Sequence, residues 1–83
     1  MNEEQQAAWE RVVRRADTRA VYMRYKIAEA EFIISDEMQV KSKREFARTA
    51  LAGYRAELAE SDVILALDAE LKRRGLRLEA VPA

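Results

Sequence analysis

The chain has 83 residues, in which 15 lysines and arginines balance 15 acids, and it contains no histidine and no cysteine. Its length allows one domain with a small core, and the missing residue types exclude disulfide bonds, thiolate metal sites and catalysis by histidine. The neutral total argues against a surface built wholly for nucleic acid, while two glycines, one proline and 36% charged residues indicate an all-α protein.

The N-terminal segment MNEEQQAAWE is acidic and polar, which is unlike a signal peptide. No apolar run approaches the roughly 18 residues that a membrane span requires, and a chain without cysteine suits a reducing compartment. We therefore expect a cytoplasmic protein that binds neither a membrane nor a cofactor.

A first helix is predicted from about residue 3 to about residue 38. Asn2 is a favourable N-cap, and Glu3 and Glu4 lie in the first turn, where the helix dipole stabilises acids. Apolar residues then recur at alternating spacings of three and four, which is the heptad pattern of a coiled coil. They form one seam: Trp9, Val13, Ala16, Ala20, Met23, Ile27, Ala30 and Ile34.

The turn is predicted within DEMQVKSKRE, residues 36–45. Ser42 and Glu45 have the spacing of a capping box, in which each side chain satisfies a free backbone N–H group at a helix start. This spacing predicts a second helix that begins at Lys43. Its end is predicted at KRRG, where three bases precede Gly75 in the left-handed position that ends many helices.

The predicted hairpin domain covers residues 1–75 and is followed by a C-terminal tail, residues 76–83. Leu76 stands where it would pack back onto the last turns of the second helix. The tail sequence, LRLEAVPA, is expected to be frayed or loosely docked.

The second helix carries an apolar stripe that shifts by about a third of a turn near Ser61 and Asp62. The first part of the stripe is Phe46, Ala47, Ala50, Leu51, Tyr54 and Leu58, and the second part is Val63, Ile64, Leu65, Leu67 and Leu71. Ser61 is a suitable N-cap. The second helix is therefore expected either to continue, with or without a kink near 60–62, or to split there and give a short third helix over about 62–74.

Two apolar stripes run along the first helix within residues 20–34, AVYMRYKIAEAEFII. One is the seam, and the other lies about 150° away at 100° per residue. The second stripe consists of Val21, Tyr25, Ala28 and Phe32. One partner helix covers only one stripe, so we predict that two hairpins pair into an antiparallel four-helix bundle, a homodimer. The alternative is a monomeric three-helix bundle, in which 62–74 folds over the second stripe.

Net charge alternates in blocks along the chain. It is positive over 9–26 and 38–55 and negative over 27–37 and 56–70. Folding the chain near residue 40 places each positive block opposite a negative one, which favours an antiparallel hairpin even though each exposed pair contributes little. The pattern also suits antiparallel pairing of the first helix with a second copy of itself.

Two basic clusters are candidate contacts for phosphates or for a partner. The first comprises Arg11, Arg14, Arg15 and Arg19, and the second comprises Lys41, Lys43, Arg44 and Arg48. Phosphate contacts through them would make the protein a nucleic-acid binder. The simpler interpretation is that the first cluster pairs with the acidic block across the hairpin. The second cluster is not followed by the glycine-containing turn of a helix-turn-helix motif.

Glu57 and Glu60 lie one helical turn apart, as magnesium ligands can. A magnesium-dependent hydrolase would need a second carboxylate pair at a fixed separation, and none follows in the sequence. Arg19 and Arg24 are expected to neutralise these acids instead. No serine or threonine has a histidine to activate it, so nucleophilic catalysis has no candidate residue.

The sequence therefore predicts a small non-enzymatic helical protein that self-associates and acts by binding another macromolecule, most simply a protein. Adaptors, inhibitors and assembly factors are the kinds of protein that such a chain resembles in architecture. The alternative is a small nucleic-acid-binding regulator that uses the basic surfaces around 11–19 and 41–48.

Overall fold

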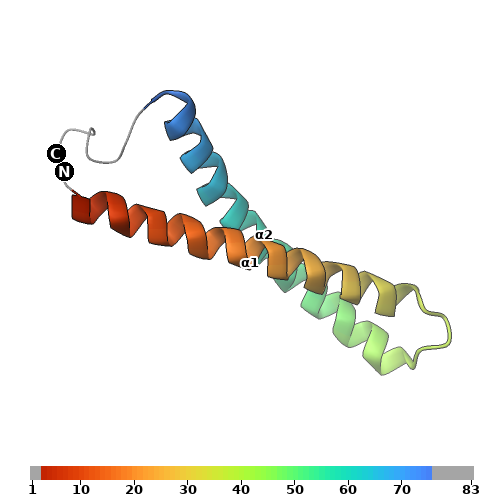
Figure 1. Cartoon of the computed structure of the whole chain (residues 1–83). Coiled ribbons are helices and arrows are strands. Elements are labelled where there is room, and N and C mark those ends of the chain that lie inside the picture. The colour runs from red at the N-terminus through yellow and green to blue at the C-terminus, as the bar shows by residue number, and fades with distance from the viewer. Residues whose placement is uncertain (1–2, 76–83) are drawn as a thin grey trace.

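Two long antiparallel helices joined by one short turn make up the described part of the chain, residues 3–75, in this computed structural model (Figure 1). Helix α1 spans Glu3–Ser35 and helix α2 spans Lys41–Arg73, with 33 residues in each. At 1.5 Å per residue each helix is about 50 Å long. The predicted all-α helical hairpin is confirmed, and the predicted tail, residues 76–83, lies outside the described residues.

The predicted seam of α1 is the side that faces α2. Its buried residues are Ala16, Ala20, Met23 and Ala30. Its larger residues are mostly half-buried: Trp9, Val13, Ile27 and Ile34. Because alternating spacings of three and four keep these side chains on one side of the helix, a single partner helix covers the whole seam.

Helix α1 ends at Ser35, earlier than predicted, because Asp36 stabilises the turn that follows. The Asp36 carboxylate accepts a hydrogen bond from the backbone N–H of Met38 at 3.0 Å, and its carbonyl oxygen accepts one from Gln39 at 3.0 Å. An aspartate that binds the backbone two residues ahead favours a turn over a further turn of helix.

Helix α2 begins at Lys41, so the predicted start at Lys43 is wrong. Its N-cap is Val40, which has an extended backbone and makes no side-chain capping hydrogen bond. The Val40 carbonyl oxygen accepts the first helical hydrogen bond, at 3.2 Å. Because α2 begins two residues earlier than predicted, Ser42 lies inside its first turn and forms no capping box with Glu45.

Helix α2 ends as predicted, at a glycine in the left-handed conformation. Gly75 has φ of 69°, and its N–H donates to the carbonyl oxygen of Lys72 at 3.0 Å. This bond satisfies one of the carbonyl groups that the end of a helix leaves free. The predicted contact of Leu76 lies outside the described residues.

Helix α2 runs unbroken through residues 60–62, so the predicted split is wrong, and so is the three-helix alternative. Ser61 is not an N-cap, because it lies within α2, where its side chain is buried at 2% exposure. The side of α2 that faces α1 keeps alternating spacings of three and four throughout: Ala47, Leu51, Tyr54, Leu58, Ser61, Leu65 and Asp68. Two positions of this seam, Ser61 and Asp68, are polar. The apolar residues alone therefore shift around the helix, although the side that faces α1 stays the same.

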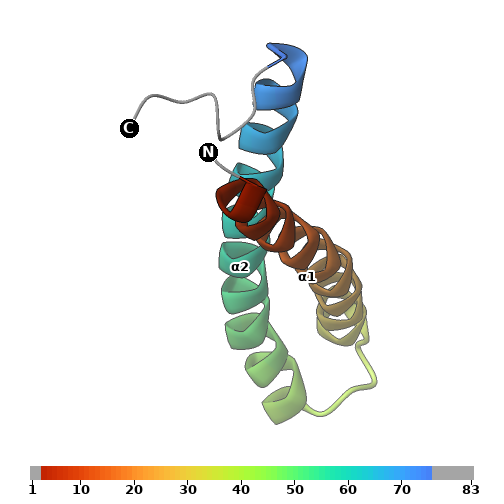
Figure 2. The ribbon, with the colours of Figure 1, turned by 60° about the vertical axis from the view of Figure 1, so that its left-hand side comes forward.

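The two helices cross near the middle of their lengths (Figure 1), and both views show the free end of α2 turned away from the free end of α1 (Figures 1 and 2). The core cluster near the turn consists of Ala30, Ala47 and Leu51, against which Ile27, Ile33, Ile34 and Tyr54 pack. Small side chains at the contact let helix axes approach closely. Within residues 3–75 no large side chain is fully buried, so the core of a single hairpin is thin.

Replacing Gly53 with alanine is expected to stabilise the protein by about 0.5–1 kcal/mol, because alanine loses less conformational entropy than glycine in a helix. A Cβ atom at Gly53 would meet nothing within 4 Å, and the position is exposed. Urea unfolding followed by circular dichroism measures the difference between wild type and Gly53→Ala.

The matched control for this substitution is Gly75→Ala, because the φ of 69° at Gly75 disfavours any side chain. That variant should be destabilised by about 1 kcal/mol. A loss of stability in Gly53→Ala would contradict the open surroundings of Gly53 and would place another chain in close contact with α2 at that point.

Candidate interaction surface

The second apolar stripe lies on the outer side of α1, away from α2, and is here called the outer α1 stripe: Val21, Tyr25, Ala28 and Phe32. Val21 is 63% exposed, Tyr25 62% and Phe32 71%. Since α2 occupies a direction about 150° away around α1, nothing in the described part of the chain covers this line. A contiguous exposed apolar surface is typical of a contact site for another molecule.

Polar side chains border the outer α1 stripe on both edges. On the helical wheel, Arg24 and Glu31 lie along one edge, and Tyr22 and Glu29 lie along the other. Arg24 also forms an ion pair across the hairpin with Asp62, at 3.1 Å. An apolar centre with a polar rim is the usual composition of a protein–protein interface.

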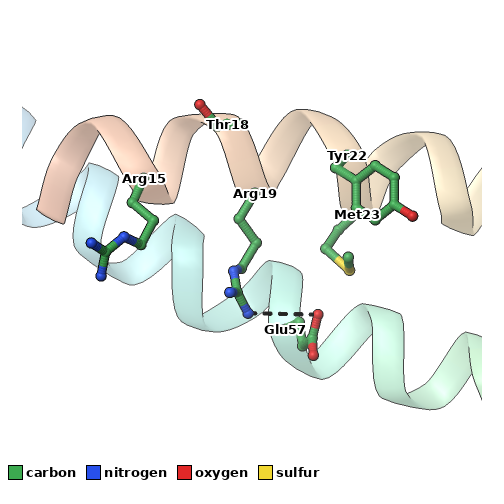
Figure 3. A pocket seen from close by; sticks show the side chains of 6 residues that line it. All are labelled: Arg15, Thr18, Arg19, Tyr22, Met23 and Glu57. Atoms are coloured by element: carbon green, nitrogen blue, oxygen red, sulfur yellow. Dashed lines mark ion pairs between the residues drawn. The ribbon is translucent and has the colours of Figure 1, made fainter. Parts of the chain in front are cut away.

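The first basic cluster lies on the N-terminal half of α1, and its four arginines are exposed. Arg19 forms a long ion pair with Glu57, 3.9 Å between Nη1 and Oε2, at an open pocket of about 470 Å³ (Figure 3). Arg11, Arg14 and Arg15 form no ion pair or hydrogen bond with another described residue. The expected pairing of this cluster with the acidic block is therefore confirmed only for Arg19.

The second basic cluster lies at the start of α2, at the opposite end of the hairpin from the first. Lys41 pairs with Glu45 at 3.9 Å, whereas Lys43, Arg44 and Arg48 form no ion pair within the described chain. The side chain of Arg44 is half-buried, and its Nε atom is buried without a hydrogen-bond partner. The antiparallel fold therefore does not join the two clusters into one basic surface.

Two acids of α2, Glu57 and Asp62, form ion pairs across the hairpin. Glu57 is paired with Arg19, as predicted, but Arg24 pairs with Asp62 and not with Glu60. Within the described part of the chain, no group of three acids could hold a metal ion. Magnesium-dependent chemistry at Glu57 and Glu60 therefore gains no support from their surroundings.

A hydrogen bond between Trp9 and Asp68, which the sequence analysis missed, joins the diverging parts of the two helices. Trp9 Nε1 donates to Asp68 Oδ1 at 2.8 Å, and Lys72 Nζ pairs with Oδ2 at 3.0 Å. Burial raises the pKa of Asp68, but hydrogen bonds from Lys72 and Trp9 outweigh it, so the pKa lies below its ordinary value. Extending the heptad spacing of α2 past Leu58 places Asp68 in the seam and would have found this contact.

Phe46 belongs to the predicted apolar stripe of α2, but the structure leaves it 76% exposed. It lies beside an open pocket of about 260 Å³ near the turn, whose lining includes Ile33, Lys43 and Tyr54. The adjacent residue, Ala47, occupies the seam instead. Phe46 is therefore an exposed aromatic side chain outside the outer α1 stripe.

Comparison with protein-family models, with curated proteins and with solved structures gives no match in any of the three. Within residues 3–75, neither helix contains an apolar stretch that could cross a membrane. The function therefore has to be inferred from the surface chemistry of the hairpin.

Substituting Asp68 with asparagine is expected to destabilise the protein at pH 7 by about 1 kcal/mol, because the charged hydrogen bond with the exposed Lys72 is lost. The stabilisation from Asp68 is present above the ordinary aspartate pKa and is lost as the pH falls through the lowered pKa of the folded state. The difference between wild type and variant should therefore shrink below about pH 4. Urea unfolding at neutral and acidic pH, followed by fluorescence of Trp9, the one tryptophan, measures this difference.

Asp17→Asn is the matched control, since Asp17 is an exposed carboxylate on α1. It should change stability little at either pH. A difference between wild type and Asp68→Asn that is the same at neutral and acidic pH would contradict the role assigned to the Asp68 charge.

Proposed function

We propose that this protein is a non-enzymatic, cytoplasmic interaction module that forms a homodimer through the outer α1 stripe and acts by binding another protein. The observation that carries the proposal is the exposure of Val21, Tyr25 and Phe32, at 63%, 62% and 71%, in one line along a helix. Burying the two aromatic and two aliphatic side chains of the outer α1 stripe contributes on the order of 5 kcal/mol per chain before association costs.

The thin core of the single hairpin also supports self-association. Four of the six buried apolar residues in the described part of the chain are alanines, and an alanine side chain removes little apolar area from water. Small domains with a marginal core are commonly stabilised by oligomerisation.

Apolar residues on α2 support binding to a different protein. Phe46 is 76% exposed, Val63 68% and Leu67 50%, and dimerisation through α1 would leave all three uncovered. Exposed aromatic side chains often anchor protein–protein interfaces. The dimer would therefore leave exposed apolar side chains on both copies of α2 for contact with a partner. A chain without histidine or cysteine offers no activated nucleophile, which is why we propose binding and not catalysis.

A second candidate function is that of a small nucleic-acid-binding regulator. It is favoured by Arg11, Arg14 and Arg15, which are exposed and unpaired within residues 3–75 and could contact phosphates. Two observations weigh against it: the acid Glu60 lines the same open pocket as Arg15, and the two basic clusters lie at opposite ends of the hairpin.

Tyr25→Asp and Phe32→Asp are each expected to convert the dimer to a monomer while keeping the helical content, because both side chains are exposed in the hairpin and a charge in an apolar interface is costly. Sedimentation equilibrium or light scattering measures the mass, and circular dichroism measures the helical content. Val63→Asp is the matched control: Val63 is 68% exposed but lies on α2, so this variant should stay dimeric. If Tyr25→Asp and Phe32→Asp both remained dimeric, the interface would lie elsewhere.

Binding to duplex DNA distinguishes the two candidate functions. On the proposed function, the wild-type protein should show no specific binding at roughly 0.15 M salt, and Arg14→Glu combined with Arg15→Glu should change nothing. Binding that falls steeply as salt rises, and that the double variant abolishes, would instead establish the nucleic-acid candidate. A fluorescence anisotropy titration with labelled duplex at several salt concentrations makes this measurement.

A further inference from the structure

The direction in which the outer α1 stripe points restricts how two hairpins can pair, if the proposed dimer is correct. In a closed square bundle each helix contacts two neighbours in directions about 90° apart. On α1 the seam and the outer α1 stripe are about 150° apart, so α2 and a second copy of α1 would lie on nearly opposite sides. The four helices would then form an open row, with the two α1 helices at its centre.

We propose that the two copies of α1 pair antiparallel, in the register that places Val21 against the partner's Phe32 and Tyr25 against the partner's Ala28. The inference rests on the proposed dimer and adds its geometry. This register centres the symmetry axis between residues 26 and 27, at the middle of the outer α1 stripe. By symmetry each contact occurs twice, so all four residues of the stripe are covered in both chains.

Side-chain size favours this antiparallel register. It sets the two large side chains, Tyr25 and Phe32, against two smaller ones, and thus allows close packing. A parallel pair would instead set Phe32 against the partner's Phe32 and Ala28 against the partner's Ala28. The two phenylalanines would then hold the helix axes apart, and the two alanines would leave a gap between the helices.

Charge along the two edges of the stripe favours the same arrangement. In an antiparallel pair, each edge of one helix meets the same edge of the other. Arg24 faces position 29 of the partner, so the partner's Glu31 is two residues away. Tyr22 faces position 31, so its hydroxyl is equally near the partner's Glu29. A parallel pair would bring the acidic segment 27–37 against its own copy, and like charges facing one another are destabilising.

The ion pair already formed by Arg24 does not prevent this contact. Arg24 Nη2 binds Asp62 at 3.1 Å, but a guanidinium has five N–H donors. Glu31 is exposed and has no hydrogen bond or ion pair within residues 3–75. Arg24 can therefore keep Asp62 and also bind the partner's Glu31.

Disulfide cross-linking tests the register directly, because the chain has no native cysteine. Val21→Cys and Phe32→Cys variants are prepared separately, mixed, oxidised in a glutathione buffer and run on a non-reducing gel. The proposed register predicts cross-linked dimer in the mixture and none in either variant alone. Two copies of Val21 would lie 11 residues apart along the helix pair, about 16 Å, which is too far for a disulfide.

Tyr25→Cys mixed with Ala28→Cys is a second pair, which keeps Val21 and Phe32 intact if their loss weakens the dimer. Val63→Cys mixed with Phe32→Cys is the control for random collision, and it should give no cross-link.

The masses of the wild-type and reduced variant proteins separate the failure of this inference from failure of the proposed function. A monomeric wild type at micromolar concentration would overturn the dimer itself. A dimeric wild type whose Val21→Cys variant cross-links alone would overturn the antiparallel register and leave the dimer standing. A dimeric wild type with no cross-link in either mixture would overturn the register, because the contact would then use a shifted register or another face.

Discussion

The one-sided contact between α1 and α2 is the constraint on which the rest of the structure depends. In a two-helix hairpin each helix has one neighbour, which covers one stripe of side chains and leaves the remaining circumference in solvent. Any apolar residue away from the seam must therefore stay exposed. Val21, Tyr25 and Phe32 on α1, and Phe46 on α2, all follow from this geometry. Their exposure is a consequence of having too few helices for the number of apolar faces.

The parts of the fold that could be predicted from the sequence are those with a local or periodic cause. The seam of α1 follows from its spacing, and the end of α2 follows from Gly75, because few other residues adopt a left-handed backbone so readily. The start of α2 could not be predicted as well. Ser42 and Glu45 have the spacing of a capping box, but the hydrogen bonds of Asp36 set the length of the turn. No local rule says which of these two signals determines where the helix starts.

The same distinction between local patterns and contacts across the hairpin applies to the surface residues. The outer α1 stripe could be located from the wheel alone, because its exposure requires only that α2 lie on the other side. Ser61 and Asp68 could not be placed from composition, since a polar residue inside a seam looks like the end of a stripe. Asp68 is tolerated there because Trp9 and Lys72 supply its hydrogen bonds. Such a polar position becomes interpretable only once its partner across the hairpin is known.

The divergence of the two helices gives the hairpin a gradient of local stability. Contacts beside the turn join residues that are close in the chain, whereas the Trp9–Asp68 hydrogen bond joins residues 59 positions apart. Closing a longer loop costs more entropy, and the packing it secures at the diverging ends is sparser. Separation of the two helices should therefore start at their free ends and proceed toward Ala30 and Ala47. Backbone amides near Trp9 would exchange their protons with solvent long before those beside the turn.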